Sequence, residues 1–369
     1  MDCAHHDAGR CRSCFLLPLG RNEQVARKEA HCRALLGDGP TWLPTVVGAE
    51  TGFRNKAKMV VAGTVTSPTL GILGPDGAGV DLRDCGLHAA PIQVALPVLA
   101  DFVGAARLTP YDVPTRRGEL KHVLVTASPD SELMVRFVLR STESLPRIRK
   151  HLPGLHDALP GLRVVSVNVQ PEHKAVLDGP EEIVLSEAVS LPMRLGERTL
   201  HLRPRSFFQT NTDVAVALYG QAAAWVEEIA PRSVLDLYCG VGGFALHLAG
   251  RGREVHGTEL TPEAVSSARQ SVREAGLENI SFSVGDAAEE PLDDRDLVLV
   301  NPPRRGLGVE LARRLEASAV RHVLYSSCRA ETLARDLTDM PSLRPRRAVL
   351  FDMFPHTDHY EVLVLLTRD

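Results

Sequence analysis

Residues 234–250 read VLDLYCGVGGFALHLAG, and this stretch decides the fold of the carboxyl-terminal half. A short apolar strand runs into the glycine-rich turn CGVGG, and a helical segment follows the turn. Glycine lets a backbone approach a ligand closely, and open α/β sheets bind ligands at the carboxyl ends of their strands. The stretch therefore predicts a ligand site where a strand of a parallel sheet meets a helix.

The segments that follow repeat this alternation. The strand-like stretches EVHGTEL, ISFSVGD, DLVLV and HVLYSS are separated by helical ones, of which PEAVSSARQSVREAG and RAETLARDL are the clearest. Such alternation predicts a parallel, doubly wound α/β sheet. The last two strands, RAVLFDMF and YEVLVLLT, have no helix between them and predict an antiparallel hairpin at the sheet edge. This ending resembles a class I (Rossmann-like) methyltransferase domain.

The region before residue 200 has a different pattern. HVLVTAS, ELMVRFVLRS, LRVVSVNVQ and EEIVLSE alternate apolar and polar residues and are separated by turn residues. They predict an antiparallel or mixed sheet in an N-terminal and central α+β domain, which ends before RPRSFFQTN. We also expect one amphipathic helix over Asn22 to Leu36, whose apolar face carries Val25, Cys32, Leu35 and Leu36.

Length and composition limit the class of protein. The 369 residues leave room for two domains, and 44% hydrophobic with 24% charged residues is ordinary for a globular protein. The opening residues, MDCAHHDAGRCRSC, contain no apolar run of signal-peptide length. No apolar run approaches the roughly 18 residues that a membrane span needs. We therefore expect a cytoplasmic protein without membrane contact.

The formal net charge of −4 argues against a protein that coats nucleic acid non-specifically, because such proteins rely on bulk positive charge. A local basic face is still compatible with this charge. The candidates are Arg54, Lys56 and Lys58 in FRNKAK, and Arg116, Arg117 and Lys121 in RRGELKH. Each group equally fits an ordinary solvated surface.

Acidic residues stand where a nucleoside would bind. Asp236 lies four positions before Gly240, and Glu259 ends the next strand, where its carboxylate can accept hydrogen bonds from ribose hydroxyls. Asp286 ends the third strand and suits the adenine edge, or a simple turn cap. The pattern favours S-adenosylmethionine over NAD, although a carboxylate such as Glu259 also occurs in NAD sites.

The fourth strand runs directly into Asn301-Pro-Pro-Arg-Arg-Gly. Successive prolines fix a rigid turn, which aims Asn301 into the ligand crevice. An Asn-Pro-Pro sequence at this place is familiar from methyltransferases that act on planar nitrogens. Methylation of an adenine or a glutamine amide is therefore one possible activity.

Methylation of carbon 5 of uracil requires a cysteine and a base, because C5 becomes nucleophilic only after a thiolate adds to C6. Cys328 follows HVLYSS and precedes a helix, whose N-terminus, with Arg329, would stabilise a thiolate. A buried, inert cysteine would fit the same position. Cys239 is the competing thiol, but a thiolate in the glycine loop would risk being methylated itself.

Glu361 is the preferred base, because it begins the last strand, which would return beside the strand that carries Cys328. His356 and His359 also titrate near neutral pH. In SFFQTN, Phe207 or Phe208 could stack on a base taken out of its helix, or both could be core residues. Gln209 beside them can donate and accept hydrogen bonds at once.

The chain has seven cysteines, and an odd number without an export signal argues against a disulfide framework. Cys3, Cys11 and Cys14 have the spacing C-x7-C-x2-C, and Cys85 follows much later. Four such thiolates suit an iron–sulfur cluster or zinc, and His5 and His6 keep the zinc interpretation open. Cys32 is expected in the hydrophobic core.

Taken together, seven motifs resemble the bacterial uracil-C5 RNA methyltransferase family from end to end: CAHHDAGRCRSC, FRNKAKMVV, SFFQTN, DLYCGVGGF, NPPRRG, YSSC and FDMFPHTDHYEV. The resemblance implies that Cys328 is the nucleophile and Glu361 the general base. It implies a [4Fe–4S] cluster on Cys3, Cys11, Cys14 and Cys85. It also places four residues around S-adenosylmethionine: Gln209, Tyr238, Glu259 and Asn301.

Within that family, tRNA enzymes lack the cluster cysteines, and longer ribosomal enzymes carry a β-barrel before them. This chain begins at the cluster motif and has Asn rather than the common Asp before Pro-Pro, which resembles the compact 23S rRNA members. The resemblance implies a monomer that forms 5-methyluridine from a flipped uridine of 23S rRNA. The remaining alternative is an iron–sulfur RNA-binding protein without activity.

The resemblance also implies a discontinuous domain map. Residues 1–16 and 49–200 are expected to form an iron–sulfur and RNA-binding domain. Residues 201–369 are expected to form the S-adenosylmethionine-dependent methyltransferase domain, with the helical segment 17–48 packed on it.

Overall fold

Two separate hydrophobic cores divide the chain into two units in the computed structural model, which describes residues 1–174, 176–250, 252–292 and 294–368. The first unit contains Met1–Cys14, Glu50–Arg194 and Arg203–Arg205. The second contains Phe15–Ala49, Leu195–Leu202 and Ser206–Asp369. Helices long and apolar enough to cross a membrane are absent from the described ranges.

The first unit is built on a seven-stranded sheet with the order β5-β4-β3-β6-β7-β8-β9. Its strands are β3 (Lys56–Gly63), β4 (Pro68–Leu73), β5 (Gly79–Asp81), β6 (Leu120–Ala127), β7 (Leu133–Leu139), β8 (Leu162–Val169) and β9 (Glu181–Val184). Neighbouring strands are antiparallel, except that β7 and β8 run parallel. The mixed sheet predicted from the alternating segments is therefore confirmed, whereas β3 to β5 were not predicted.

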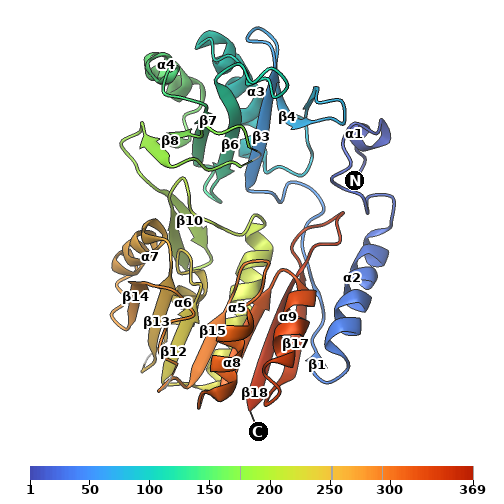
Figure 1. The fold of residues 1–369 in the computed structure, drawn as a ribbon, viewed down its shortest axis with the longest axis vertical. Coiled ribbons are helices and arrows are strands. Elements are labelled where there is room, and N and C mark those ends of the chain that lie inside the picture. Colours follow the sequence, from blue (N-terminus) through green and yellow to red (C-terminus); the bar gives the residue numbers. More distant parts are fainter. Residues whose placement is uncertain (175, 251, 293, 369) are drawn as a thin grey trace. The chain divides into compact units, whose positions relative to one another are not determined.

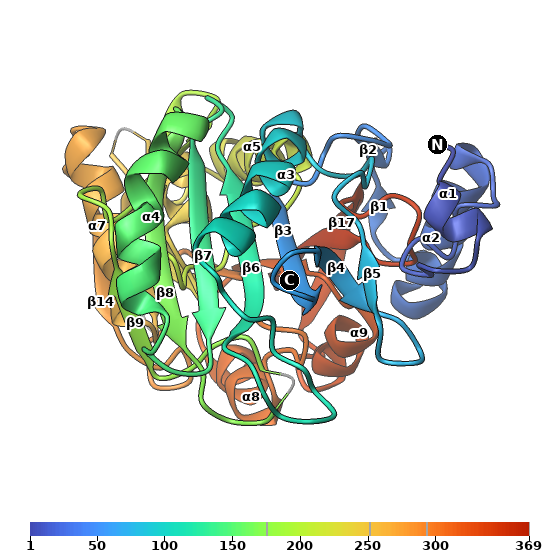
Figure 2. The same cartoon turned by 90° about the horizontal axis from the view of Figure 1, so that it is seen from above.

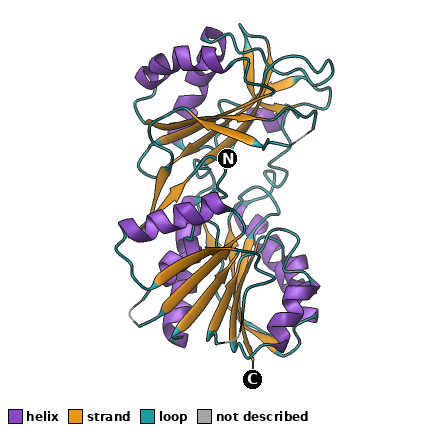
Figure 3. Ribbon diagram, turned by 60° about the vertical axis from the view of Figure 1, so that its left-hand side comes forward, coloured by secondary structure: helices purple, strands orange, loops and turns teal. Residues whose placement is uncertain are grey.

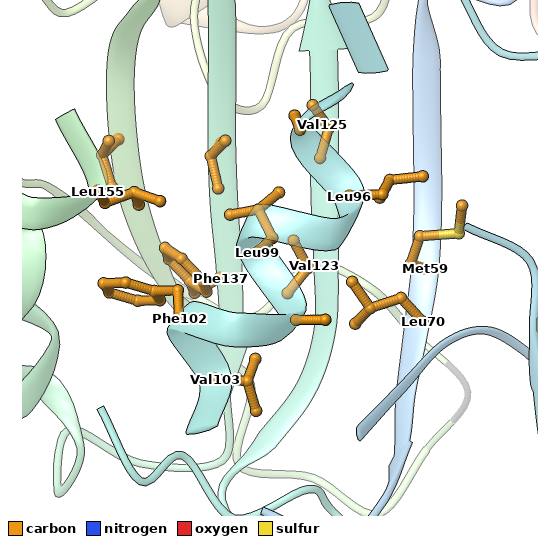
Figure 4. Packing of buried hydrophobic residues seen from close by; sticks show 14 of the residues in the cluster. Met59, Leu70, Leu96, Leu99, Phe102, Val103, Val123, Val125, Phe137 and Leu155 are labelled. Atoms are coloured by element: carbon orange, nitrogen blue, oxygen red, sulfur yellow. The ribbon is translucent and has the colours of Figure 1, made fainter. Parts of the chain in front are cut away.

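One face of this sheet is covered by helices α3 (Ala90–Ala105) and α4 (Leu145–Ala158) (Figure 2). Figure 4 shows Leu96, Leu99 and Phe102 of α3 packed against side chains of the central strands, among them Phe137 of β7. The ring centroids of Phe102 and Phe137 are 5.4 Å apart. A short helix, α1 (Ala4–Asp7), lies near the start of the chain.

Two residues of the candidate basic patches are structural rather than exposed cations. Lys121 is buried, and its Nζ donates to the carbonyl oxygens of Gln170 and Glu172 at 2.7 and 2.6 Å. Burial lowers the pKa of Lys56 to about 8. The interpretation of Lys121 as a surface cation was therefore wrong, because carbonyl groups of a distant segment hold its ammonium group, whereas Lys56 is half-buried and Lys58 is exposed. Arg116 and Arg117 are exposed.

The second unit is a doubly wound sheet with helices on both faces (Figures 1 and 3). Its strand order is β1-β17-β18-β16-β15-β12-β13-β14, and β2 also pairs with β17. The strands are β1 (Thr41–Trp42), β2 (Val46–Val47), β12 (Ser233–Leu237), β13 (Glu254–Glu259), β14 (Ile280–Val284), β15 (Leu297–Val300), β16 (His322–Ser327), β17 (Leu343–Asp352) and β18 (Glu361–Arg368).

The predicted alternation is confirmed in this unit. The helices are α2 (Arg21–Leu36), α5 (Thr212–Ile229), α6 (Gly243–Leu248), α7 (Pro262–Glu274), α8 (Val309–Ala317) and α9 (Ala330–Thr338). Strands β12 to β16 run parallel, and β18 is antiparallel to both β16 and β17. The expected hairpin is present, but β1 and β2 pair with β17, so that β17 is not the edge. Strands β10 (Leu191–Leu195) and β11 (Arg198–Leu202) form a separate two-stranded sheet.

The predicted apolar face of helix α2 is confirmed in part, because Cys32 is fully buried and Leu35 and Leu36 pack against the core. The buried residues of α2 are Gln24, Lys28 and Cys32, spaced four apart, whereas Val25 is only half-buried. The Nζ of Lys28 donates to the Asp352 carboxylate and to the carbonyl oxygen of Phe354 at 2.9 Å, and Arg21 also pairs with Asp352. The apolar pattern could not show this, because the partner of Lys28 lies at the end of β17, more than 300 positions away along the chain.

We expect Lys28→Met to destabilise the protein by about 3 kcal/mol, because it leaves the buried Asp352 carboxylate with one of its two cations. Thermal unfolding of wild type and variant at neutral pH measures this. Arg33→Met is the matched control, since Arg33 is exposed on the same helix and lies over the Trp42 ring. Its loss should cost less than about 1 kcal/mol. Equal melting of the two variants would contradict a clamp between α2 and β17.

Candidate active site

The carboxyl ends of the parallel strands bring the predicted site residues to one edge of the second unit's sheet. Tyr238 follows β12, Glu259 ends β13, Asn301 follows β15 and Cys328 follows β16. The order of the strands reverses at β12, with β13 on one side and β15 on the other. Doubly wound sheets bind their ligands at such a reversal. The predicted glycine turn therefore lies at the reversal of strand order, where this class of sheet binds ligands.

The glycine turn after β12 requires glycine for steric reasons. Gly242 has a φ of +85°, and a Cβ atom there would lie 2.7 Å from Leu246 and 2.9 Å from Phe282. The amide of Gly240 donates to Glu259 Oε2 at 3.2 Å, which ties the turn to the end of β13. The other carboxylate oxygen of Glu259 accepts from the Thr261 amide at 2.9 Å. Each oxygen keeps a lone pair, so the carboxylate is fixed in place yet able to accept from a ligand hydroxyl.

Asp236 and Asp286 each use one carboxylate oxygen within the protein. Asp236 is fully buried, and its Oδ2 accepts from the Ala245 amide at 3.0 Å, which braces the first turn of α6. Burial raises the pKa of Asp236 to about 8, and its Oδ1 is buried without a hydrogen bond within the described ranges. Asp286 is exposed, and its Oδ1 accepts from the Ala288 amide at 2.9 Å, so it caps a turn.

The aromatic pair at 207 and 208 is divided between surface and core. Phe207 is 74% exposed, whereas Phe208 is 5% exposed. Only Phe207 is therefore available to stack on a ligand, a distinction that the sequence left open. Gln209 is buried, and Tyr238 is half-buried with a φ of +61°.

Cys328 and Glu361 are neighbours. Ser327 of β16 pairs with Val362 of β18, so the next residue of each strand, Cys328 and Glu361, lie beside each other. The Oγ of Ser326 donates to Glu361 Oε1 at 2.6 Å. Glu361 is 1% exposed, whereas Cys328 is half-buried and lines a pocket. A thiol open to a pocket and a buried carboxyl therefore share one end of the sheet.

Burial determines the electrostatics of this pair. It raises the pKa of Glu361 to about 7, and the Ser326 hydrogen bond only partly offsets that effect. It also raises the pKa of Cys328, and the Glu361 carboxylate adds to the increase. The cation that lowers the pKa of Cys328 is Arg304, which also hydrogen-bonds its side chain. The sequence suggested Arg329 for this effect, but Arg329 lies 3.7 Å from the Glu331 carboxylate, whereas Arg304 contacts the thiol.

Arg304 was not among the predicted site residues, although the NPPRRG motif contains it. Its loop is fixed by Asp336, whose Oδ2 accepts from the Leu307 amide and from the Tyr325 hydroxyl, both at 2.7 Å. Gly306, in the same loop, has a φ of +81°, and a Cβ atom there would lie 2.4 Å from the Asp336 carboxylate. The loop therefore depends on glycine, and it holds Arg304 at the thiol.

The other candidate thiol and one candidate base are buried. Burial raises the pKa of Cys239 well above its usual range, which makes it a poor nucleophile. The His356 amide donates to Gln24 Oε1 at 2.9 Å, which ties this buried histidine to α2. Cys32 is fully buried in the core, as predicted. His359 is exposed at the pocket of Cys328.

The first unit brings four cysteines together near its start: Cys3, Cys11, Cys14 and Cys85. Burial raises the pKa of Cys14 to about 11, and the other three thiols add to the increase. A shared neighbourhood of four thiols fits the donor set of an iron–sulfur cluster. The Nε2–H of His5 donates to Asp84 Oδ1 at 2.7 Å. Over the described ranges, no three His, Cys, Asp or Glu side chains are arranged to hold a single metal ion.

Comparisons with known proteins identify the fold. A family model described as "Methyltransferase domain" matches residues 234–302, and one described as "tRNA (Uracil-5-)-methyltransferase" matches residues 293–369. A solved tRNA (uracil-54, C5)-methyltransferase of Pyrococcus abyssi, in complex with S-adenosyl-L-homocysteine, is similar with a TM-score of 0.82 and 27% identity. The match covers 96% of this chain and 85% of that one. The fold and the matched family models thus define a class I methyltransferase.

Closer relatives identify the family. The 23S rRNA (uracil(747)-C(5))-methyltransferase RlmC of Escherichia coli strain K12 is 47% identical over 374 residues, which cover 100% of both chains. RlmC of Yersinia pestis strain Pestoides F is 49% identical over 373 residues, which cover 100% of this chain and 99% of the relative. The chain belongs to the RlmC family of methyltransferases, which confirms the resemblance predicted from the motifs.

The pKa of Glu361 predicts a pH-dependent stability. Because the folded pKa of about 7 exceeds the unfolded value of 4.5, the folded state binds the proton more tightly. Wild-type stability should therefore fall as pH rises from 4.5 through about 7, by roughly 3 kcal/mol in total. Glu361→Gln cannot ionise, so it should melt higher than wild type at pH 8 and similarly at pH 5. Parallel melting curves at every pH would show that Glu361 does not titrate in this range.

Proposed function

We propose that the protein methylates C5 of a uridine in 23S rRNA, using S-adenosylmethionine as methyl donor, Cys328 as nucleophile and Glu361 as general base. The observation that carries the proposal is the adjacency of a pocket-lining thiol and a fully buried carboxyl at the paired ends of β16 and β18. Methylation of a nitrogen requires neither a nucleophilic thiol nor a base for a carbon-bound proton. The names of the relatives support the substrate and the position of the methyl group.

The crevice residues have the chemistry that the methyl donor requires. We infer that Glu259 accepts from the ribose hydroxyls and that Asp286 faces the adenine edge with its free oxygen. Gly240 gives the backbone access to the ligand, and the free Oδ1 of Asp236 can accept a further donor. We assign three further contacts with S-adenosylmethionine to Gln209, Tyr238 and Asn301. When bound, S-adenosylmethionine supplies a methyl group on a positively charged sulfur.

Cys328 begins the reaction when its sulfur forms a bond to C6 of the flipped uracil, and the π electrons of C5=C6 move toward the C4 carbonyl oxygen. C5 then bonds to the methyl group of the donor, and the S–CH3 bond of the sulfonium breaks with its electrons left on the departing thioether sulfur. Glu361 removes the C5 proton, and the electrons of that C–H bond restore C5=C6 as the S–C6 bond breaks. The thiolate of Cys328 is regenerated, and the product is 5-methyluridine.

The electrostatics of the pair suit this order of events. A neutral Glu361 does not oppose a thiolate on Cys328, and a pKa of about 7 keeps the neutral carboxyl accessible near neutral pH. Arg304 stabilises the thiolate. Once sulfur is bonded to carbon, it no longer opposes ionisation of Glu361, which releases its own proton to solvent and can then accept the C5 proton. We assign Phe207 to stack on the flipped base, because its ring is exposed.

We also propose that Cys3, Cys11, Cys14 and Cys85 hold a [4Fe–4S] cluster, and that Met1–Cys14 with Glu50–Arg194 form an RNA-binding domain. The support is the gathering of these thiols and the family resemblance. A thiolate cluster would fix the first residues of the chain in place. We expect a cytoplasmic monomer.

The nucleophile is tested with a 23S rRNA hairpin that carries 5-fluorouridine, because fluorine replaces the proton that the base must remove. With S-adenosylmethionine, the wild type should give a covalent adduct on a denaturing gel. Cys328→Ala should give none, whereas Cys32→Ala, which removes a core thiol, should keep it. Glu361→Gln should accumulate the adduct even on ordinary uridine. Methyl transfer without any adduct would refute the C5 mechanism and favour nitrogen methylation.

The cluster is tested by iron and acid-labile sulfide analysis of protein purified without oxygen. We expect about four irons per chain in the wild type and in Cys32→Ala. Cys85→Ala should lose most of this iron, because it removes one of the four ligands. Zinc in place of iron, or unchanged iron in Cys85→Ala, would refute the assignment.

A further inference from the structure

The pocket at Cys328 has a wall that the catalytic motifs do not account for. This pocket, of about 330 Å³, is lined on one side by α2, with Arg27, Lys28 and His31. Its remaining lining comes from the loop of Arg304, the start of α9 and the segment that precedes Glu361. All these residues belong to the second unit. An N-terminal helix therefore forms part of the surroundings of the nucleophile.

Basic side chains outnumber carboxylates in the lining of this pocket. Glu331 lies 3.5 Å from His31 and 3.7 Å from Arg329, so it is shared between two basic groups. The second carboxylate of the lining, Asp358, lies 3.6 Å from His359. Lys28 is paired with Asp352 beneath the helix. These contacts use both carboxylates of the lining.

Two fixed cations of the lining, Arg27 and Arg304, therefore have no ion-pair partner within residues 1–174, 176–250, 252–292 and 294–368. Arg304 hydrogen-bonds the side chain of Cys328. Arg27 is exposed, and Glu23, one turn earlier, stands at the spacing for an ion pair but forms none in the structure. The clamp of Lys28 to Asp352 holds the helix, so Arg27 is presented from a fixed support at the pocket.

We propose that Arg27 binds a backbone phosphate of the RNA next to the target uridine. This inference rests on the proposed function. A uridine whose base enters the pocket brings its own ribose and flanking phosphates to the mouth, and the neutral base offers no charge for an arginine. A guanidinium can hold two phosphate oxygens with parallel hydrogen bonds. The cationic wall also disfavours the positively charged methyl donor, which leaves an anionic ligand as its complement.

Arg27 is assigned a role in RNA binding and not in chemistry. We expect Arg27→Ala to raise the Kd for the 23S rRNA hairpin on the order of tenfold, with unchanged kcat at saturating RNA. The slope of log Kd against log salt should fall by about 0.7 to 0.9, as expected for one lost phosphate contact. Arg27→Lys should retain the slope, because it keeps the charge. Affinity for S-adenosylmethionine, measured by calorimetry, should not change.

The matched control is Arg33→Ala, which removes the same charge from an exposed position on the same helix outside the pocket. A similar Kd and salt slope for Arg27→Ala and Arg33→Ala would overturn the proposal, as would a loss of kcat with Kd unchanged. Failure of the wild type to form the fluorouridine adduct would instead refute the proposed function. The two failures are therefore distinguishable in one set of preparations.

Discussion

The catalytic end of the second unit depends on the ion pairs of the buried Asp352 carboxylate. Arg21 and Lys28 of α2 both pair with it, and Lys28 also binds the Phe354 carbonyl. Asp352 ends β17 and Glu361 begins β18, so these contacts fix the turn between the two strands. A buried ion pair is weak evidence for stability, but removing one partner is costly, and the pair can specify a unique arrangement. Here the ion pairs of Asp352 fix the point at which β18 begins, and therefore the position of Glu361.

The second constraint is that the Cys328–Glu361 pair carries one negative charge more easily than two. Burial disfavours both anions, and each anion disfavours the other. Ionisation of Glu361 therefore opposes ionisation of Cys328. Because Arg304 hydrogen-bonds Cys328, it favours a negative charge on the thiol over one on Glu361. The same arrangement lets the carboxyl ionise after sulfur has bonded to carbon.

Most of the second unit's fold could be predicted, because its strands and helices alternate at regular spacing and glycine occurs at a sterically required turn. The buried lysines and the loop that holds Arg304 could not be predicted. Lys28 and Lys121 are buried by hydrogen bonds to distant segments, and no local pattern distinguishes such a lysine from a surface one. The sequence suggested Arg329 and not Arg304 as the cation at the thiol. The loop of Arg304 is held by a hydrogen bond to Asp336, a contact that the order of residues along the chain does not reveal. Phe207 and Phe208 are adjacent residues of the same type, so the sequence did not show that Phe207 is the exposed one.

The net charge of −4 makes local charge decisive for an RNA-binding enzyme. Bulk attraction cannot supply affinity, so cations must stand where phosphates arrive. The sequence indicated two basic patches, yet the ammonium group of Lys121 donates to backbone carbonyls, and Lys56 is half-buried in a strand. Two cations without an ion-pair partner among the described residues, Arg27 and Arg304, lie instead beside the nucleophile. A local cationic site at the pocket would favour productive encounters, because it attracts the backbone only where the base can enter.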